Sequence, residues 1–281
     1  MFKGHGGDLA GIEERFGIPP EEILDFSSNI NPVPLPEPAR QAFYQSFSQI
    51  GAYPDPRCGK LVRKASLRFG HPPEEILAGN GSTEFIFLIP RIFPQPKIHL
   101  IGPTYPDYEA AGILAGKEVL FHDLGTSPGP DDVRNLLDSL PKERALLFFC
   151  NPNNPTGSSL SGESLRRLVY SYPFLIFIID EAYADFSGRE NVSLLGQPLP
   201  ENLFVLRSLT KIFAIPGARL GLVFGTGKLI ARLDKGREPW TVNLPAQKAG
   251  EVLLGEKGYL DASRLHNQYE RVRLGRMLRS I

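Results

Sequence analysis

Five short apolar runs, each followed by polar or glycine residues, constrain the fold of this 281-residue chain more than any other feature. They do not alternate apolar with polar residues, so both faces of each strand are expected to be buried, as in a parallel sheet covered by helices. Segments with helical character lie before and between them. The predicted strands span 97–101, 145–150, 174–179, 203–206 and 220–224, and the predicted helices span 82–92, 105–115, 131–140 and 161–170.

This alternation predicts an α/β fold of three layers, αβα, with one mainly parallel central sheet. Functional residues in such sheets gather just beyond the carboxyl ends of the strands. The first 60 residues hold eight prolines and predict no long regular element, because proline fixes φ and lacks a donor. Residues 260–281 contain no proline and predict one long helix.

The composition excludes several classes of protein. Lysine plus arginine (31) balances aspartate plus glutamate (31), which argues against a general nucleic-acid binder or a protein of anionic membrane surfaces. Two cysteines, Cys58 and Cys150, cannot build a disulfide framework, so we expect a reducing, cytoplasmic location. The sequence holds no apolar run of membrane-spanning length, and its five histidines lack metal-ligand spacing, so we expect neither a membrane nor a metal partner.

Two charged side chains follow the apolar runs at 174–179 and 203–206. Asp180 comes directly after the first run, where a carboxylate is costly unless it has a cationic partner; the alternative is a helix cap. Lys211 is followed by apolar residues, and an amine in apolar surroundings has a lowered pKa and can attack a carbonyl. Its alternative is an ordinary surface lysine, and Arg219 lies eight positions further on.

Two loops complete the candidate set. The segment 79–84 places glycines, then Ser82 and Thr83, at the start of a helix, a geometry that binds phosphate or carboxylate; the alternative is a capped helix. The segment 151–157 is a proline-rich loop at a strand end, or only a turn. An anion site, a carboxylate, a reactive lysine and an arginine together describe a pyridoxal 5′-phosphate site.

The order of four motifs resembles the fold-type-I aminotransferase superfamily, which depends on pyridoxal phosphate. The motifs are Asn-Pro-x-Asn-Pro-Thr-Gly at 151–157, Asp-Glu-x-Tyr at 180–183, Ser-x-x-Lys at 208–211, and Arg219. The resemblance implies that Lys211 forms the Schiff base with the cofactor and that Asp180 keeps the pyridine nitrogen protonated. It further implies that Tyr183 and Asn154 hydrogen-bond the phenolate oxygen of the ring. The cofactor phosphate would be bound by Gly81, Ser82, Thr83, Ser208 and Arg219.

Two tyrosines receive further roles from the same resemblance. Tyr105 would stack on the face of the cofactor ring. Tyr53 would reach the phosphate of the neighbouring subunit, which implies a homodimer with shared active sites.

The amino-terminal strings His5-Gly6-Gly7-Asp8 and 18–32 are similar to threonine-phosphate decarboxylases of cobalamin biosynthesis. That resemblance implies L-threonine O-3-phosphate as substrate and (R)-1-aminopropan-2-yl phosphate as product, with His5 and Asn31 near the substrate. His5 as part of a frayed terminus is the alternative. Histidinol-phosphate aminotransferases share most of the motifs, so a transaminase stays open. So do a cofactor-binding protein without catalysis and a scaffold without cofactor.

The resemblance also predicts a division of the chain. Residues 1–35 would form an amino-terminal arm and small-domain segment, 36–245 the large cofactor-binding domain, and 246–281 an interdomain helix with the start of an incomplete small domain. Members of the superfamily continue into a small carboxyl-terminal domain that carries a substrate-binding arginine. We expect that domain to be truncated here and turnover to be impaired as a result.

Overall fold

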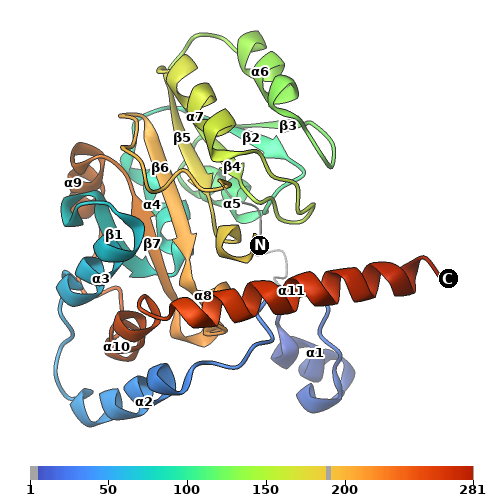
Figure 1. Cartoon of the computed structure of the whole chain (residues 1–281). Helices are drawn as coiled ribbons and strands as arrows, with labels where there is room; N and C mark the ends of the chain where they lie inside the picture. The colour runs from blue at the N-terminus through green and yellow to red at the C-terminus, as the bar shows by residue number, and fades with distance from the viewer. Residues whose placement is uncertain (1–5, 188–190, 281) are drawn as a thin grey trace.

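The computed structural model describes residues 6–187 and 191–280. Its described part contains a seven-stranded sheet in the order β1-β7-β6-β5-β4-β2-β3 (Figure 1). Among these strands β7 runs opposite to the other six, which confirms a mainly parallel sheet. The strands are β1 (Ile76–Asn80), β2 (Lys97–Gly102), β3 (Glu118–Asp123), β4 (Ala145–Cys150), β5 (Leu175–Asp180), β6 (Leu203–Ser208) and β7 (Leu220–Phe224).

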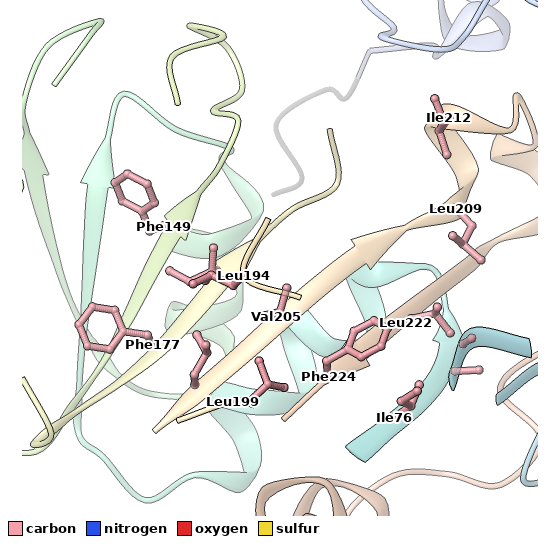
Figure 2. Packing of buried hydrophobic residues seen from close by; sticks show 14 of the residues in the cluster. Ile76, Phe149, Phe177, Leu194, Leu199, Val205, Leu209, Ile212, Leu222 and Phe224 are labelled. Atoms are coloured by element: carbon pink, nitrogen blue, oxygen red, sulfur yellow. The ribbon is translucent and has the colours of Figure 1, made fainter. Parts of the chain in front are cut away.

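Helices cover both faces of the sheet, which confirms the three-layer αβα architecture (Figure 1). One face packs on α4 (Ser82–Ile92), α5 (Asp107–Leu114) and α9 (Gly227–Lys235). The other packs on α3 (Gly59–Phe69), α6 (Pro130–Ser139), α7 (Gly162–Ser171) and α10 (Leu244–Leu253). Figure 2 shows the core on this second face, where Phe149, Phe177 and Val205 come from adjacent strands.

The absence of apolar–polar alternation has a direct structural cause. All six residues of β4 are buried, and adjacent side chains such as Phe148 and Phe149 belong to the two different cores. Because successive side chains of a strand point to opposite faces, a strand covered twice must be apolar throughout. The five predicted strands are therefore confirmed to within two residues at each end.

Two strands, β1 and β3, were not predicted from the apolar runs. β3 is an edge strand, and its exposed Glu118 and Asp123 break any apolar run. β1 is short and ends in Gly79 and Asn80, residues that favour turns.

The proline-rich first 60 residues contain two helices, α1 (Leu9–Phe16) and α2 (Glu37–Ser46), so the expectation of no long regular element there was wrong for α2. Pro38 lies in the first turn of α2, where its missing N–H has no intrahelical partner to lose. The prolines delimit this helix without interrupting it.

The long carboxyl-terminal helix is α11 (Lys257–Leu278), as predicted for this region. Its first turns are anchored by the buried Tyr259, Leu260 and Ser263, and the remainder extends past the body of the molecule (Figure 1). The predicted domain boundary at 245 falls inside the first turn of α10, a helix that packs in the main core. The division at 35 and 245 stays a prediction.

The remaining short helices are α8 (Leu209–Ile212) and the 3₁₀ turns η1 (Pro20–Glu22), η2 (Phe47–Gln49), η3 (Pro73–Glu75), η4 (Ala184–Phe186) and η5 (Pro216–Ala218). In the described ranges, every helix is either too short or too polar to cross a membrane.

A histidine pair at the sheet edge, in which His99 is buried and His122 half-buried, predicts acid sensitivity. His99 on β2 shares a 2.9 Å hydrogen bond and a stacked contact with His122 on β3, and burial lowers the pKa of His99 to about 4. The unfolded chain therefore binds the proton more readily than the folded chain, so stability is complete above the ordinary value of 6.5 and is lost as the pH falls from there toward 4. We expect Tm to fall between pH 7 and pH 5, and His99→Gln to flatten that fall.

Thermal melts followed by circular dichroism at several pH values measure this. His266→Gln, at an exposed position on α11, is the control and should keep the parent profile. A His99→Gln variant with the same pH dependence as the parent would show that another group causes it.

Candidate active site

The carboxyl ends of β4, β5 and β6 and the amino end of α4 surround a cleft of about 570 Å³. The structure brings ten of the predicted site residues to the lining of this one cleft. They are Gly81, Ser82, Thr83, Tyr105, Asn154, Asp180, Tyr183, Ser208, Lys211 and Arg219.

The amino end of α4 forms a cradle for an anion. Gly81 is the N-cap with φ +76°, and in the described part of the chain no side chain caps the helix. A Cβ on Gly81 would lie 2.8 Å from Nη2 of Arg219, and a Cβ on Gly221 would lie 2.2 Å from the backbone nitrogen of Ser82. The first helical amides and a guanidinium thus lie together where side chains have no room, which favours a phosphate.

The residue at the N-cap of α4 distinguishes an anion site from a helix capped by its own side chain. Ser82 and Thr83 are the first helical residues and not the cap, so a helix closed by its own Ser or Thr hydroxyl is not what forms here. Ser208, at the end of β6, adds a hydroxyl to the same cleft and exchanges a 2.7 Å hydrogen bond with Thr210. The alternative of a helix capped by Ser82 or Thr83 is therefore wrong, and an anion site at this helix start stays a prediction.

Lys211 lies in α8, directly after β6. Burial, together with the nearby positive charge of Arg219, lowers the pKa of the Lys211 amine, and Asp180 opposes this in part. The next two residues, Ile212 and Phe213, are fully buried. A larger fraction of this amine is therefore uncharged near neutral pH than for a surface lysine, as a nucleophile requires.

Asp180 ends β5 as a buried carboxylate facing the cleft. It accepts hydrogen bonds from the Tyr108 hydroxyl (2.8 Å) and the Ala182 amide (2.9 Å). Burial raises the pKa of Asp180, and these two bonds and Lys211 oppose the rise. A cationic ring nitrogen in the cleft would be the partner that such a carboxylate needs.

Tyr108 is a site residue that the sequence reasoning missed. It lies three positions after Tyr105 within the predicted helix 105–115, and residues at that spacing share one side of a helix. Its ring is fully buried and stacks on Phe148, with 4.8 Å between the ring centroids. The i,i+3 spacing from Tyr105 was the available signal.

The loop 151–157 is tied to the loop that carries Tyr105. The Asn153 side chain donates to the Pro103 carbonyl at 2.8 Å and accepts from the Thr104 hydroxyl at 3.2 Å. Asn151, fully buried, accepts from the Leu160 amide at 2.8 Å. These bonds join the loops that carry Asn154 and Tyr105, two residues of the cleft lining, so the loop is more than a connecting turn.

Two predicted residues in the described part of the chain, Asn31 and Tyr53, do not line the cleft. The side-chain amide of Asn31 is buried and donates to Ile212, Tyr259 and Ser263, so it anchors the Lys211 segment to α11, and its neighbours Asn29 and Ile30 line the cleft instead. Tyr53 is 83% exposed and packs on Trp240. His5 lies outside the described residues.

The sequence profile of the family described as "Aminotransferase class I and II" matches residues 21–281. The chain belongs to this family. Members of the class I and II aminotransferases depend on pyridoxal phosphate, and the cofactor of this site is therefore pyridoxal 5′-phosphate. The residues present fit that group, because the α4 cradle suits its phosphate, the Lys211 amine its aldehyde and the buried Asp180 its ring nitrogen.

Three relatives show which proteins of known name this chain resembles. The chain is 31% identical over 264 residues to the adenosylcobalamin biosynthesis bifunctional protein CobDQ of Leptospira interrogans, covering 92% of this chain and 30% of that protein. It is 34% identical over 262 residues to threonine-phosphate decarboxylase of Salmonella typhimurium (92% and 72%). It is 35% identical over 240 residues to histidinol-phosphate aminotransferase of Desulfitobacterium hafniense (83% and 66%).

A solved structure agrees with the fold. The histidinol-phosphate aminotransferase of Clostridium acetobutylicum matches with a TM-score of 0.82 at 29% identity, covering 92% of this chain and 78% of that one. Both branches predicted from the motifs are thus represented among the relatives, and the chain spans only part of each of them.

The α4 cradle predicts a specific loss of cofactor affinity in Gly81→Ala. The added methyl strains a backbone at φ +76° and displaces the Arg219 guanidinium from the phosphate position, which we expect to cost about 1–3 kcal/mol of binding, or about 5- to 150-fold in Kd. Absorbance titration of the cofactor-free protein with pyridoxal phosphate measures this. Gly116→Ala is the matched control, with φ +69° and open space around its Cβ, and should leave the affinity unchanged. Equal affinities in the two variants would contradict the cradle.

Proposed function

We propose that the chain decarboxylates L-threonine O-3-phosphate to (R)-1-aminopropan-2-yl phosphate with pyridoxal phosphate as cofactor. The 34% identity to threonine-phosphate decarboxylase of Salmonella typhimurium supports this activity. So does the 31% identity to a bifunctional protein of adenosylcobalamin biosynthesis.

The position of the two amino-terminal segments, 5–8 and 18–32, is the observation that favours decarboxylation over transamination. They resemble threonine-phosphate decarboxylases, and their residues line the same cleft as Lys211. The Gly7 amide donates to the Ser27 hydroxyl at 2.9 Å, which joins the two strings to each other. The cleft-lining members are Gly6, Gly7, Ser27, Ser28, Asn29 and Ile30. The segment that distinguishes the branch thus contributes to the wall where a substrate would lie.

Bound pyridoxal phosphate supplies a carbonyl that condenses with amines and a ring that accepts the electron pair left on Cα. In the proposal, Lys211 holds the cofactor covalently and, after substrate has replaced it, delivers a proton to Cα. Asp180 keeps a proton on the ring nitrogen, and Tyr183 and Asn154 hydrogen-bond the ring oxygen. Tyr105 covers one face of the ring.

Orientation of the substrate decides which bond at Cα breaks, because only a bond perpendicular to the ring overlaps its π electrons. A carboxylate held there leaves as CO₂, and a hydrogen held there leaves as a proton. The groups that hold the ring serve both reactions, so the groups that hold the substrate make the choice.

A second cleft of about 890 Å³ adjoins the first and shares Asn29, Ile30, Asn154 and Tyr183 with it. Its wall on α11 carries three arginines and one glutamate: Arg264, Arg271, Arg273 and Glu270. The excess positive charge suits a phosphorylated amino acid. The same charge suits histidinol phosphate equally. It therefore supports a phosphorylated substrate but does not distinguish a decarboxylase from an aminotransferase.

The alternative is a histidinol-phosphate aminotransferase, favoured by the 35% identity to the enzyme of Desulfitobacterium hafniense. The same ring-holding residues would then remove the Cα proton. A further alternative is a protein that binds the cofactor without turnover.

Two parallel assays of the cofactor-loaded protein decide among these. One contains L-threonine O-3-phosphate and measures CO₂; the other contains histidinol phosphate with 2-oxoglutarate and measures glutamate. CO₂ in the first assay supports the proposal, and glutamate without CO₂ overturns it in favour of the transaminase. Borohydride trapping at Lys211 with no product in either assay supports binding without catalysis. Lys211→Ala serves as the blank.

We further propose a homodimer with shared active sites. The segment that ends at Tyr53 presents large side chains to solvent, with Tyr44, Phe47 and Ile50 each more than half exposed. Burying such a surface favours association. Sedimentation equilibrium should give twice the 31.1 kDa chain mass, and a monomer at assay concentrations would refute the shared site.

A further inference from the structure

A buried ion pair lies directly behind the cleft. Glu181 follows Asp180 at the end of β5, and Arg207 precedes Ser208 on β6. Successive residues of a strand point to opposite faces, so Asp180 and Ser208 line the cleft while Glu181 and Arg207 lie on the far side of the sheet. The Glu181 amide donates to the Leu206 carbonyl at 2.9 Å, which continues the pairing of the two strand ends.

The pair is enclosed by further contacts. Glu181 is fully buried and Arg207 is 5% exposed, with 3.3 Å between Glu181 Oε2 and Arg207 Nε. Glu181 also accepts from the Leu194 amide (2.7 Å) and the Ser193 hydroxyl (2.6 Å). Arg207 donates to the same Ser193 hydroxyl at 3.1 Å. One hydroxyl therefore bridges both charges.

The network reaches the segment that carries Tyr183. Arg207 Nη1 lies 3.3 Å from Asp185 Oδ2 in η4, two residues after Tyr183. Arg264 of α11 donates to the Asp185 carbonyl at 2.9 Å. The ring of Phe69 lies 5.2 Å from the Arg207 guanidinium carbon and supports it from α3. The ends of β5 and β6 and the η4 turn are thus joined on the face opposite the cleft.

Stability alone is a poor reason to bury such a pair. Removing two charges from water costs several kcal/mol per ion, and packed apolar residues would stabilise the fold at least as well. What the hydrogen bonds around this pair do provide is a single geometry, because Glu181 accepts from the Leu194 amide and the Ser193 hydroxyl while Arg207 donates to the same hydroxyl.

We propose that Glu181 and Arg207 are positioning residues for the cofactor: their ion pair locks the ends of β5 and β6 so that Asp180 meets the ring nitrogen and Ser208 meets the phosphate. Neither residue touches the cofactor itself. This inference rests on the proposed roles of Asp180 and Ser208.

The test compares Glu181→Gln and Arg207→Lys with the parent. Both variants keep the side-chain size approximately and change the charge or the donor geometry. The readouts are the Kd for pyridoxal phosphate added to the cofactor-free protein, the midpoint of the pH titration of the bound cofactor's visible band, and the Tm of the cofactor-free protein. We expect a Kd raised about tenfold, as is common when supporting residues of a site are altered, and a shifted pH midpoint.

Glu75→Gln is the matched control. It removes a carboxylate that pairs with His71 at 3.0 Å on the same side of the sheet but away from the cleft, and should change Tm without moving Kd or the pH midpoint. If the buried-pair variants fail to fold, Ser193→Ala removes the bridging hydroxyl and its hydrogen bonds with Glu181, Arg207 and the Leu195 amide. Both charges stay in place, so Kd should rise only about two- to threefold.

A purely structural role would lower Tm in Glu181→Gln and Arg207→Lys with unchanged Kd and pH midpoint, and that result would overturn the inference. Parent protein that fails to bind pyridoxal phosphate would instead overturn the proposed function, so the two failures are distinguishable.

Discussion

Replacing Lys211 with alanine is expected to abolish the visible absorbance band of the bound cofactor and to reduce turnover to background. Lys211 is the one lysine among the described residues that line the cleft, and burial lowers the pKa of its amine. Without it, none of the described residues that line the cleft supplies an amine to hold the aldehyde or move a proton at Cα. The absorbance spectrum, and mass spectrometry after borohydride reduction, measure the loss.

Two variants make this result specific. Lys211→Arg keeps the charge but supplies no nucleophilic amine, so it should also lack the band. Lys235→Ala at the end of α9 removes an exposed lysine and should keep the band and the turnover. A band retained in Lys211→Ala would show that the cofactor is held elsewhere.

Asp180→Asn is expected to lower the turnover number by about 10²–10³-fold, the range for losing one well-placed electrostatic contact in an active site. Asparagine keeps the shape of the side chain, and its single carbonyl oxygen can accept one of the two hydrogen bonds that Tyr108 and Ala182 donate to different carboxylate oxygens. It lacks the negative charge that would hold a proton on the ring nitrogen. Steady-state kinetics with the substrate identified by the two assays measure the effect.

Tyr108→Phe offers a graded comparison at the same carboxylate. It removes one of the two hydrogen bonds to Asp180 without removing the charge, so a smaller loss of about tenfold is expected, in line with a bond to a charged group. Asp234→Asn on the exposed side of α9 should have no effect. An Asp180→Asn variant with parental turnover would remove this residue from the mechanism.

The strands and the principal site residues were accessible from the sequence for one physical reason. A strand buried on both faces must be apolar throughout, so β4, β5 and β6 stand out, and the polar residues directly after them must lie at one edge of the sheet. Lys211, Asp180 and Asn154 were found in this way and through the motif resemblance. β1 and β3 were not found, because short or exposed edge strands carry no such pattern.

The roles of Asn31, Tyr108, Glu181 and Arg207 depended on contacts between distant segments. Asn31 is polar and lies in the segment 18–32 that resembles decarboxylases. Its side-chain amide nevertheless donates hydrogen bonds to Ile212, Tyr259 and Ser263, which lie 181 to 232 positions away. Tyr108 reaches Asp180 across 72 positions. No local pattern encodes which polar group a folded chain will place at hydrogen-bond distance.

The opening pattern of apolar runs by itself predicted a mainly parallel sheet between helices, with functional residues gathered at its carboxyl edge, because burial on two faces leaves a signature in local composition. Only the tertiary structure decided which side chains share the cleft. It placed the amino-terminal strings beside Lys211, and it joined Glu181 to Arg207 behind Asp180 and Ser208. Such pairings arise when long-range packing brings segments together, and a carboxylate placed beside a buried strand in the sequence gains its function only from the partner that packing supplies.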